Sequence, residues 1–358
     1  MPFKRPKFSE LTSTQKNIIS CISIGDNSKY AVIGGPGTGK TILALQIILD
    51  AIKSTNDNVL FIVYNRPLAK FIASEAKKSN NNSTISTFHS WIYNFIRYQL
   101  KVDPTYYQTK MFVYDWDKLY SDLINNKNLK EYYDYIFVDE AQDLHMGAWK
   151  IIKYLSKNIN VFYDDNQRIG NDDSNDYDYS KVDVKSEIGC EENFFDLIDN
   201  FRNTKQIESV AKLFGYNYDD NNVTFKKATA IREGQKPVIL YSNSIDDTVK
   251  YILKHFNPGY SYGVLVPQFS ISGEFDKQIN AYAESFNKQM TQSQKQVFQC
   301  YKSSKSIQGN NNYEILDTGI SLMSIKASKG LEFDVVYVVE TNNPNLNIKT
   351  EINRHRLY

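Results

Sequence analysis

The 358-residue chain has few cysteines and no long apolar run. Its three cysteines, at positions 21, 190 and 300, are widely scattered and show no CxxC spacing, which argues against a disulfide framework or a zinc site. No apolar run reaches the roughly 18 residues that span a bilayer. The start, Met1 to Lys7, is basic but lacks the apolar segment of a signal peptide. We therefore expect a cytoplasmic protein with no membrane partner.

Strong charge of either sign is also missing. The 42 Lys and Arg residues nearly balance the 41 Asp and Glu residues, and the net charge is +1. A chain this close to neutrality has no global attraction to polyanions, so any contact with nucleic acid requires a local patch. The length predicts about two domains with a core each.

A phosphate-binding loop is the first motif present. Gly34-Gly35-Pro36-Gly37-Thr38-Gly39-Lys40-Thr41 fits GxxxxGK[ST], with the apolar run Tyr30–Ile33 before it and a helical pattern, Ile42–Ile52, after it. Backbone N–H groups of such a loop face phosphate oxygens, the lysine reaches the terminal phosphates, and the hydroxyl at Thr41 is placed for Mg²⁺. The residues expected to bind the phosphates of ATP are Gly35, Pro36, Gly37, Thr38, Gly39, Lys40 and Thr41.

An acidic pair follows an apolar strand about a hundred residues later, in the stretch from Tyr135 to Asp143. Asp139 suits a metal ligand beside Thr41, and Glu140 suits the group that polarises the attacking water. A buried strand ending in two acids is common by itself. The two motifs in this order predict a protein that binds a nucleoside triphosphate.

The rest of the chain alternates strands and helices, which predicts an α/β fold with parallel sheets. Runs rich in Val, Ile and Phe, without alternation, favour strands buried on both faces. The strands expected are Tyr30–Ile33, Val59–Tyr64, Thr84–Thr87, Tyr135–Val138, Ile159–Tyr163, Pro237–Tyr241, Tyr262–Val266, Ile320–Ile325 and Val335–Val339. The helices expected are Thr41–Lys53, Pro67–Ser79, Ala148–Ser156, Ile245–Phe256 and Glu274–Lys288.

We expect two domains, residues 1–200 and 201–358. The first carries a small helical insertion at about residues 90–133, whose aromatic residues, Trp116 among them, suit either core packing or base stacking. The polar, acidic stretch from Asp164 to Asp183 predicts a surface loop.

Further segments, in a fixed order, resemble the UvrD/Rep/PcrA group of superfamily 1 (1A) DNA helicases. The resemblance runs from about residue 11 to the end of the chain. Besides the phosphate loop, the segments that carry it are Leu11-Thr12-Ser13-Thr14-Gln15, the stretch around Tyr64-Asn65-Arg66-Pro67, Thr84 to Ser90, Asp139-Glu140-Ala141-Gln142-Asp143, Phe162 to Gln167, Asp199 to Asn203, and Ser324 to Phe333 with its Lys329-Gly330-Leu331-Glu332-Phe333 core.

This resemblance implies two RecA-like P-loop NTPase domains with the nucleotide between them, and a role for each matching residue. Gln15 would read adenine and Phe201 would stack on it. Domain closure would bring Arg202 to the γ-phosphate. The residues implied in catalysis are Lys40, Asp139, Glu140, Gln167 and Arg202; Gly330 and Glu332 would touch nucleotide; Asn65, Thr87, Phe88, His89, Ser324 and Lys326 would contact DNA.

Several of these residues also have ordinary explanations. Gln15 and Arg202 are, taken singly, typical surface residues, Lys326 can line a solvated face, and His89 can be a neighbour of the aromatic Trp91. Their order along the chain favours the functional interpretation.

Three departures from the family pattern bear on activity. The last family motif, with its arginine finger, is not found before Tyr358, so we expect these 358 residues to bind ATP but hydrolyse it poorly. Only about fifty residues separate Val266 from Ile320, where larger relatives have a domain-sized insertion. The residues after Gln167 lack the aromatic that relatives place near the single strand.

The favoured function is an ATP- and Mg²⁺-dependent DNA translocase or helicase moving 3′ to 5′ on single-stranded DNA, with a protein partner such as a nuclease. The alternative is an ATP-binding regulatory switch, or a component of a defence complex, with weak motor activity. An RNA-directed ATPase is a third option, which the DEAQD and KGLEF spellings disfavour.

Overall fold

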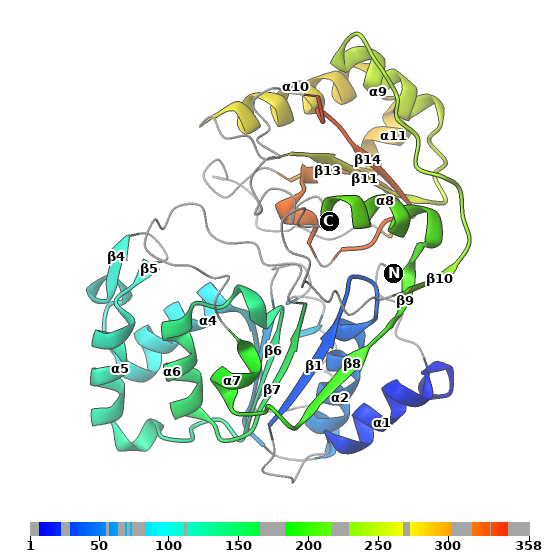
Figure 1. The fold of residues 1–358 in the computed structure, drawn as a ribbon. Coiled ribbons are helices and arrows are strands. Elements are labelled where there is room, and N and C mark those ends of the chain that lie inside the picture. The colour runs from blue at the N-terminus through cyan, green and yellow to red at the C-terminus, as the bar shows by residue number, and fades with distance from the viewer. Residues whose placement is uncertain are drawn as a thin grey trace. The chain divides into compact units, whose positions relative to one another are not determined.

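The fold consists of two compact units, seen here in a computed structural model (Figure 1). The structure describes residues 7–22, 29–54, 57–63, 69, 72–73, 83–110, 113–164, 183–215, 229–267, 273–301, 317–329 and 331–342. The first unit contains the described residues up to Glu208 and those from Thr229 to Glu233, and the second contains the remainder. Each unit has a parallel sheet, which confirms the predicted α/β class.

The first unit is built on a six-stranded parallel sheet in the order β3-β2-β6-β7-β1-β8. Every residue of β2, β6 and β7 is buried, as their unbroken apolar runs predict. β3 differs from the prediction, because it forms one edge of the sheet and is partly exposed. The strands are β1 (Tyr30–Gly34), β2 (Val59–Val63), β3 (Thr84–Thr87), β6 (Tyr135–Asp139), β7 (Ile159–Tyr163) and β8 (Phe194–Leu197).

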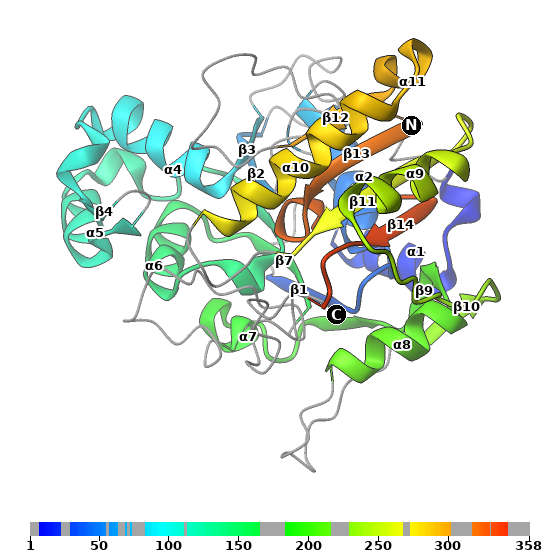
Figure 2. The same ribbon diagram turned by 90° about the horizontal axis from the view of Figure 1, so that it is seen from above.

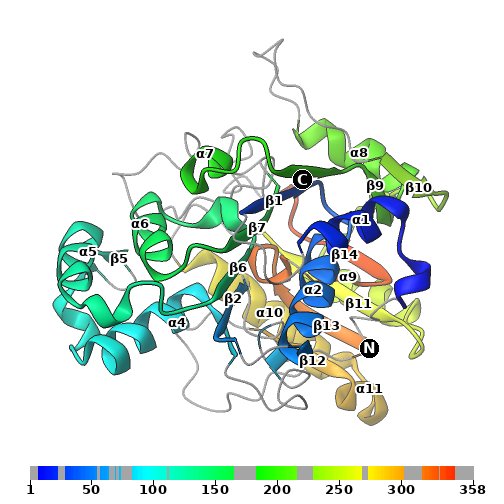
Figure 3. The same ribbon diagram turned by 90° about the horizontal axis from the view of Figure 1, so that it is seen from below.

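Helices cover both faces of this sheet. Helix α2 (Lys40–Ser54) lies on one face and α6 (Met146–Leu155) on the other (Figure 3). Helix α1 (Ser13–Cys21) starts with a capping box between Thr12 and Gln15, follows the short turn η1 (Phe8–Glu10), and packs on α2. Most of the predicted helix Pro67–Ser79 lies outside the described residues. None of the helices in the described ranges has the length and apolarity needed to cross a bilayer.

The insertion is mainly helical, as predicted, and also holds a short antiparallel hairpin. Its buried aromatic residues belong to the same hydrophobic core as α6; they are Trp91, Tyr107, Tyr114 and Trp116. It contains α4 (Phe88–Phe95), the π-helical turn η2 (Ile96–Leu100), η3 (Pro104–Tyr106), β4 (Gln108–Lys110), β5 (Val113–Tyr114), α5 (Trp116–Asn125) and η4 (Lys127–Leu129).

Several elements were not predicted. Strand β8 extends the sheet beside β1, and β9 (Asp199–Thr204) pairs in parallel with β10 (Thr229–Arg232). The short helix α7 (Val184–Ile188) precedes β8, and α8 (Lys205–Gly215) runs from the first unit into the second. Polar and acidic residues interrupt these stretches, so no unbroken apolar run marks them.

The second unit has a four-stranded parallel sheet in the order β12-β13-β11-β14, with α9 and α10 side by side on one face (Figure 2). Its predicted strands and helices are confirmed to within a few residues, except for the one described next. The elements are α9 (Ile245–Lys254), β11 (Ser261–Val266), α10 (Glu274–Gln289), α11 (Gln292–Gln296), β12 (Phe298–Cys300), β13 (Gly319–Ser324), η8 (Lys326–Ser328) and β14 (Val335–Val338).

The predicted strand Pro237–Tyr241 is wrong, because this segment joins no sheet. Its apolar side chains face solvent, with Val238 75%, Ile239 81% and Tyr241 95% exposed. A run of β-favouring residues forms a strand only where a neighbouring strand accepts its hydrogen bonds. The residues of this segment favour a β-strand, but no described strand pairs with them.

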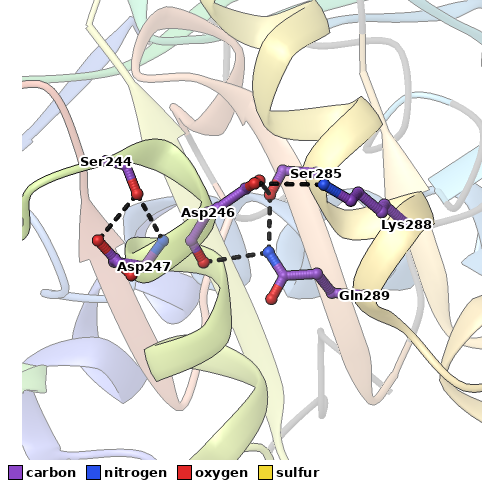
Figure 4. A network of polar contacts seen from close by, with 6 residues as sticks. All are labelled: Ser244, Asp246, Asp247, Ser285, Lys288 and Gln289. Atoms are coloured by element: carbon purple, nitrogen blue, oxygen red, sulfur yellow. Dashed lines mark hydrogen bonds and ion pairs between the residues drawn. The ribbon is translucent and has the colours of Figure 1, made fainter.

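Polar contacts join the two outer helices of this unit (Figure 4). The buried Ser285 hydroxyl, on α10, donates to Asp246 Oδ1 at 2.5 Å, and Gln289 Nε2 donates to the Asp246 carbonyl at 3.0 Å. Ser244 caps α9 by accepting from the Asp247 N–H at 3.1 Å. The network fixes the start of α9 against α10.

Candidate active site

The phosphate loop joins β1 to α2 in the middle of the first unit. Gly37 and Gly39 have φ of 76° and 86°, a left-handed conformation that favours glycine. The Thr38 hydroxyl donates to the Gly35 carbonyl at 2.9 Å and closes the loop on itself. The chain thus enters α2 through a tight turn, and the N-terminus of a helix that follows such a turn is suited to bind an anion.

Lys40 lies inside this turn. Its ammonium donates to the carbonyl oxygens of Gly34 at 2.6 Å and Gly35 at 3.1 Å, and its side chain is buried. A buried ammonium at a helix N-terminus is a point positive charge of the kind that can bind a phosphate.

Thr41, at the start of α2, and Asp139, at the end of β6, are in contact although they are 98 residues apart in sequence. The Thr41 hydroxyl donates to Asp139 Oδ2 at 2.7 Å. Burial, and then the neighbouring Glu140 carboxylate, raise the pKa of Asp139, while the Thr41 hydroxyl and the Lys40 ammonium oppose the rise. A hydroxyl and a carboxylate side by side, at the N-terminus of α2, are a donor set that fits Mg²⁺, which takes few protein ligands and completes its shell with phosphate and water oxygens. The sequence predicted these two as the metal ligands.

Glu140 follows at the end of β6 and has a left-handed backbone, with φ of 54°. Gln142 holds its side chain: the Gln142 Nε2 donates to Glu140 Oε2 at 2.6 Å, and Gln142 Oε1 accepts from the Asp164 N–H at 3.2 Å. All three side chains are buried. Gln142 therefore fixes the Glu140 carboxylate and links it to the end of β7.

Strand β9 lies directly on the phosphate loop. The Phe201 N–H donates to the Gly37 carbonyl at 2.9 Å, and the buried Asn200 Oδ1 accepts from the N–H groups of Arg202 and Asn203, both at 3.0 Å. A Cβ on Gly37 would lie 2.2 Å from Asn200 Oδ1 and 2.6 Å from Arg202 Cβ. Gly37 is thus required both by its backbone conformation and by this close approach.

Arg202 lies close to the phosphate loop, because its Cβ would be 2.6 Å from a Cβ on Gly37. It lies on β9, within the same compact unit as the phosphate loop, so its proximity to the loop is built into that unit. Strand β9 pairs in parallel with β10 in this unit.

Gln15 and Phe201 line one shallow hollow beside the loop. The hollow is bounded by Thr12, Thr14, Gln15, Thr38, Leu197, Ile198, Asp199 and Phe201. Phe201 is 37% exposed there, and a Cβ on Gly39 would lie 3.2 Å from Gln15 Nε2. Gln15 Oε1 accepts from the Thr12 N–H at 3.1 Å within the capping box, so the helix cap orients the amide beside the loop. The hollow thus brings together the aromatic ring and the amide that the sequence assigned to adenine.

Three predicted DNA contacts lie where β3 passes into α4. Thr87 ends the strand, Phe88 packs inward on Trp91 and Trp116, and His89 is exposed. The Phe88 ring is therefore part of the core at this point, while Thr87 and His89 flank it. Only His89 presents an exposed side chain.

The remaining predicted residues belong to the second unit or fall outside the described ranges. Ser324 ends β13 and its hydroxyl accepts from the Ala327 N–H at 3.0 Å, and Glu332 is half-buried before β14. Asn65, Gln167 and Gly330 lie outside the described residues, as does the side chain of Lys326.

Two residues important to this geometry had no role in the sequence interpretation. Asn200 and Gln142 both stood within the quoted motifs, but only the fold shows that each organises a turn beside the phosphate loop. The quoted motifs contain both residues, but a motif does not show which groups each residue contacts.

Comparison with known proteins supports part of this picture. Residues 9–163 match the family described as type III restriction enzyme, res subunit, a helicase-like domain, over less than half of the chain. No curated protein matches. Among solved structures, the Escherichia coli DExH-box NTPase HrpB shares 9% identity with a TM-score of 0.35, over 89% of this chain and 34% of HrpB. The chain thus spans about a third of that structure's length.

The family match covers the phosphate loop and the Asp139–Glu140 pair. Residues 9–163 are therefore similar to a helicase-like NTPase domain, and this stretch holds the phosphate loop. The match does not extend to the superfamily 1 group that the motif order resembles.

Proposed function

We propose that the protein is an ATP-dependent DNA translocase or helicase of the UvrD-like, superfamily 1 type, which couples ATP hydrolysis to 3′ to 5′ movement on single-stranded DNA. The observation that carries the proposal is the contact of Thr41 with Asp139 beside the loop, with Glu140 held next to it by Gln142. These groups supply the positioning and charge neutralisation on which phosphoryl transfer depends.

Each residue has a task in this reaction. Lys40 holds the terminal phosphates, Thr41 and Asp139 hold Mg²⁺, and Glu140 accepts a proton from, or orients, the attacking water. The metal ion would neutralise the charge of the phosphates when bound. Gln15 and Phe201 read and stack on adenine in the hollow that they share.

The remaining predicted residues complete the proposal. Gln167, Arg202, Gly330 and Glu332 are assigned to the phosphates, and Asn65, Thr87, Phe88, His89, Ser324 and Lys326 to the DNA. The motif order of the UvrD-like group supports these assignments. A domain division at residues 1–200 and 201–358, and a protein partner such as a nuclease, belong to the same proposal.

A steady-state ATPase assay tests the function. Turnover is measured with the full reading frame without nucleic acid, with single-stranded DNA and with RNA, for the wild type and for Lys40→Ala and Glu140→Gln. We expect stimulation by DNA, and a fall of about a hundredfold or more in each variant, because each removes a charged group from the reacting phosphate.

The outcomes separate the competing functions. Tight ATP binding without turnover that DNA stimulates would contradict the motor and favour the regulatory switch. Stronger stimulation by RNA would favour an RNA-directed ATPase. Displacement of streptavidin from only the 3′-labelled or only the 5′-labelled end of an oligonucleotide gives the direction of movement.

A further inference from the structure

One contact between the insertion and the segment that follows the acidic motif is made by a tryptophan. Trp116, the first residue of α5, is 8% exposed and stacks on His145, with ring centroids 5.6 Å apart and an interplanar angle of 25°. The same indole contacts Phe88, at 5.9 Å and 37°. One ring thus joins Phe88, between the two predicted DNA contacts Thr87 and His89, to the start of α6.

The start of α6 is shaped around this indole. His145 caps the helix, because its Nδ1 accepts from the Gly147 N–H at 3.0 Å. A Cβ on Gly147 would lie 2.3 Å from both Cβ and Cγ of Trp116. The tryptophan therefore occupies the space that any larger residue at position 147 would need, and it fixes the first turn of α6.

His145 also lies a short way from the chemistry. Residues Ala141–Asp143 form one tight turn between Glu140 and the capping residue, and the Leu144 N–H donates to the Ala141 carbonyl at 3.2 Å. Gln142 within that turn holds the Glu140 carboxylate at 2.6 Å. Burial lowers the pKa of His145, which favours the neutral ring that its acceptor nitrogen requires.

We propose that Trp116 and His145 are positioning residues that couple the Glu140–Gln142 turn to the Thr87–His89 segment, so that the state of the phosphate site changes the state of the predicted DNA-contacting edge. The inference rests on the proposed function, because it assigns a route between the two sites which that function requires. Neither residue touches the substrate.

The physical basis is the stiffness of packed aromatic rings. Close-packed side chains do not deform smoothly, so a shift of the turn that holds Glu140 passes to the rings packed on it. A contiguous chain of packed side chains with two arrangements is the kind of element that carries energetic coupling. These contacts run through Trp116 of the insertion. The insertion would therefore have a role in the proposed ATP-driven movement besides any contact with DNA.

The test uses two variants and one matched control. Trp116→Leu removes the ring from both neighbours. His145→Asn removes the stacking but keeps an oxygen acceptor at the helix cap, where Asn is favoured. The control is Tyr120→Leu, because Tyr120 lies one turn after Trp116 on α5 and also packs on α6, edge-on to Tyr154 at 6.3 Å.

Hydrogen exchange, measured with and without a non-hydrolysable ATP analogue, reports the route directly. In the wild type we expect the analogue to protect α2, and also α4 and the first turn of α5. We expect His145→Asn and Trp116→Leu to keep the protection of α2 and lose that of α4 and α5, whereas Tyr120→Leu keeps both. In the ATPase assay the two variants lose at least about fivefold of the stimulation by single-stranded DNA, while their turnover without DNA stays near that of the wild type.

The failures of the two proposals can be told apart. No protection of α2 in the wild type means that the nucleotide does not bind, which overturns the proposed function and the route with it. Protection of α2 without any effect on α4 and α5, or an effect that survives in both variants, overturns the route and leaves the ATPase standing. Equal losses in Tyr120→Leu also overturn it, because general loosening of α5 would then be the cause. Thermal unfolding of each variant identifies one that fails to fold, and the other then decides.

Discussion

The N–H of Phe201 donates to the carbonyl of Gly37 at 2.9 Å and fastens β9 to the phosphate loop. The hydrogen bond places the predicted base-stacking residue and the loop in one rigid arrangement. An ATP molecule would therefore meet a surface in which the base site and the phosphate site are already set at a fixed spacing.

This contact makes Gly37 sensitive to substitution. We expect Gly37→Ala to lower the affinity for ATP about tenfold or more, because the new Cβ would displace Asn200 and Arg202 in addition to straining a left-handed backbone. Gly189→Ala is the matched control, since Gly189 is also left-handed, with φ of 70°, but has open space around its Cβ position. Isothermal titration with an ATP analogue measures the difference; equal affinities in the two variants would contradict the steric argument.

Removal of the Gln142 amide should slow the chemical step. Gln142→Ala leaves the buried Glu140 carboxylate without its 2.6 Å donor, and we expect kcat to fall roughly tenfold or more with a smaller change in KM for ATP. Gln278→Ala, which breaks a similar Gln–Glu contact of 3.3 Å along helix α10, serves as the control and should leave kcat unchanged. A change in KM alone would argue that Gln142 acts on binding.

Acid should destabilise the first unit partly through His145. Burial lowers the pKa of this residue in the folded state, so the unfolded chain takes up its proton more readily than the folded chain. The neutral ring contributes stability that is present above about pH 6.5 and is lost as the pH falls below that value towards the lowered pKa. We expect His145→Asn to reduce the fall in Tm between about pH 7 and 5. An identical pH dependence in both proteins would refute this contribution.

The contacts between α9 and α10 should respond to loss of one hydroxyl. Ser285→Ala removes the donor to Asp246 and the acceptor for Gln289, and we expect Tm to fall by roughly 2–4 °C. Differential scanning calorimetry of the whole chain measures it. ATP binding to the first unit should be unaffected in this variant, which makes it a control for the predictions above.

The sequence predicted best the elements whose residues are buried on both faces. The sequence predicted β2, β6 and β7 because an unbroken apolar run is stable only when it is buried. It predicted the phosphate loop because the spacing of its glycines and lysine is typical of that loop. The predicted strand Pro237–Tyr241 failed, since strand formation also needs a partner. β8 and β9 were missed because polar residues break their short apolar runs, and their pairing depends on strands distant in the chain.

The candidate site was predicted as a set of residue types and not as a set of contacts. The Thr41–Asp139 pair could be expected from the order of two motifs, whereas the hold of Gln142 on Glu140 depends on the conformation of the turn between them. The stacking of Trp116 on His145 had no signal at all, because it joins two segments whose contact the fold alone determines.

Glutamate is an unfavourable choice on conformational grounds at position 140, where the left-handed backbone suits Asn or Gly better. Under the proposed function, its presence would be a trade-off in which activity is maintained at the expense of thermal stability. We expect Glu140→Asn to relieve both the backbone strain and the repulsion from Asp139, and so to raise Tm.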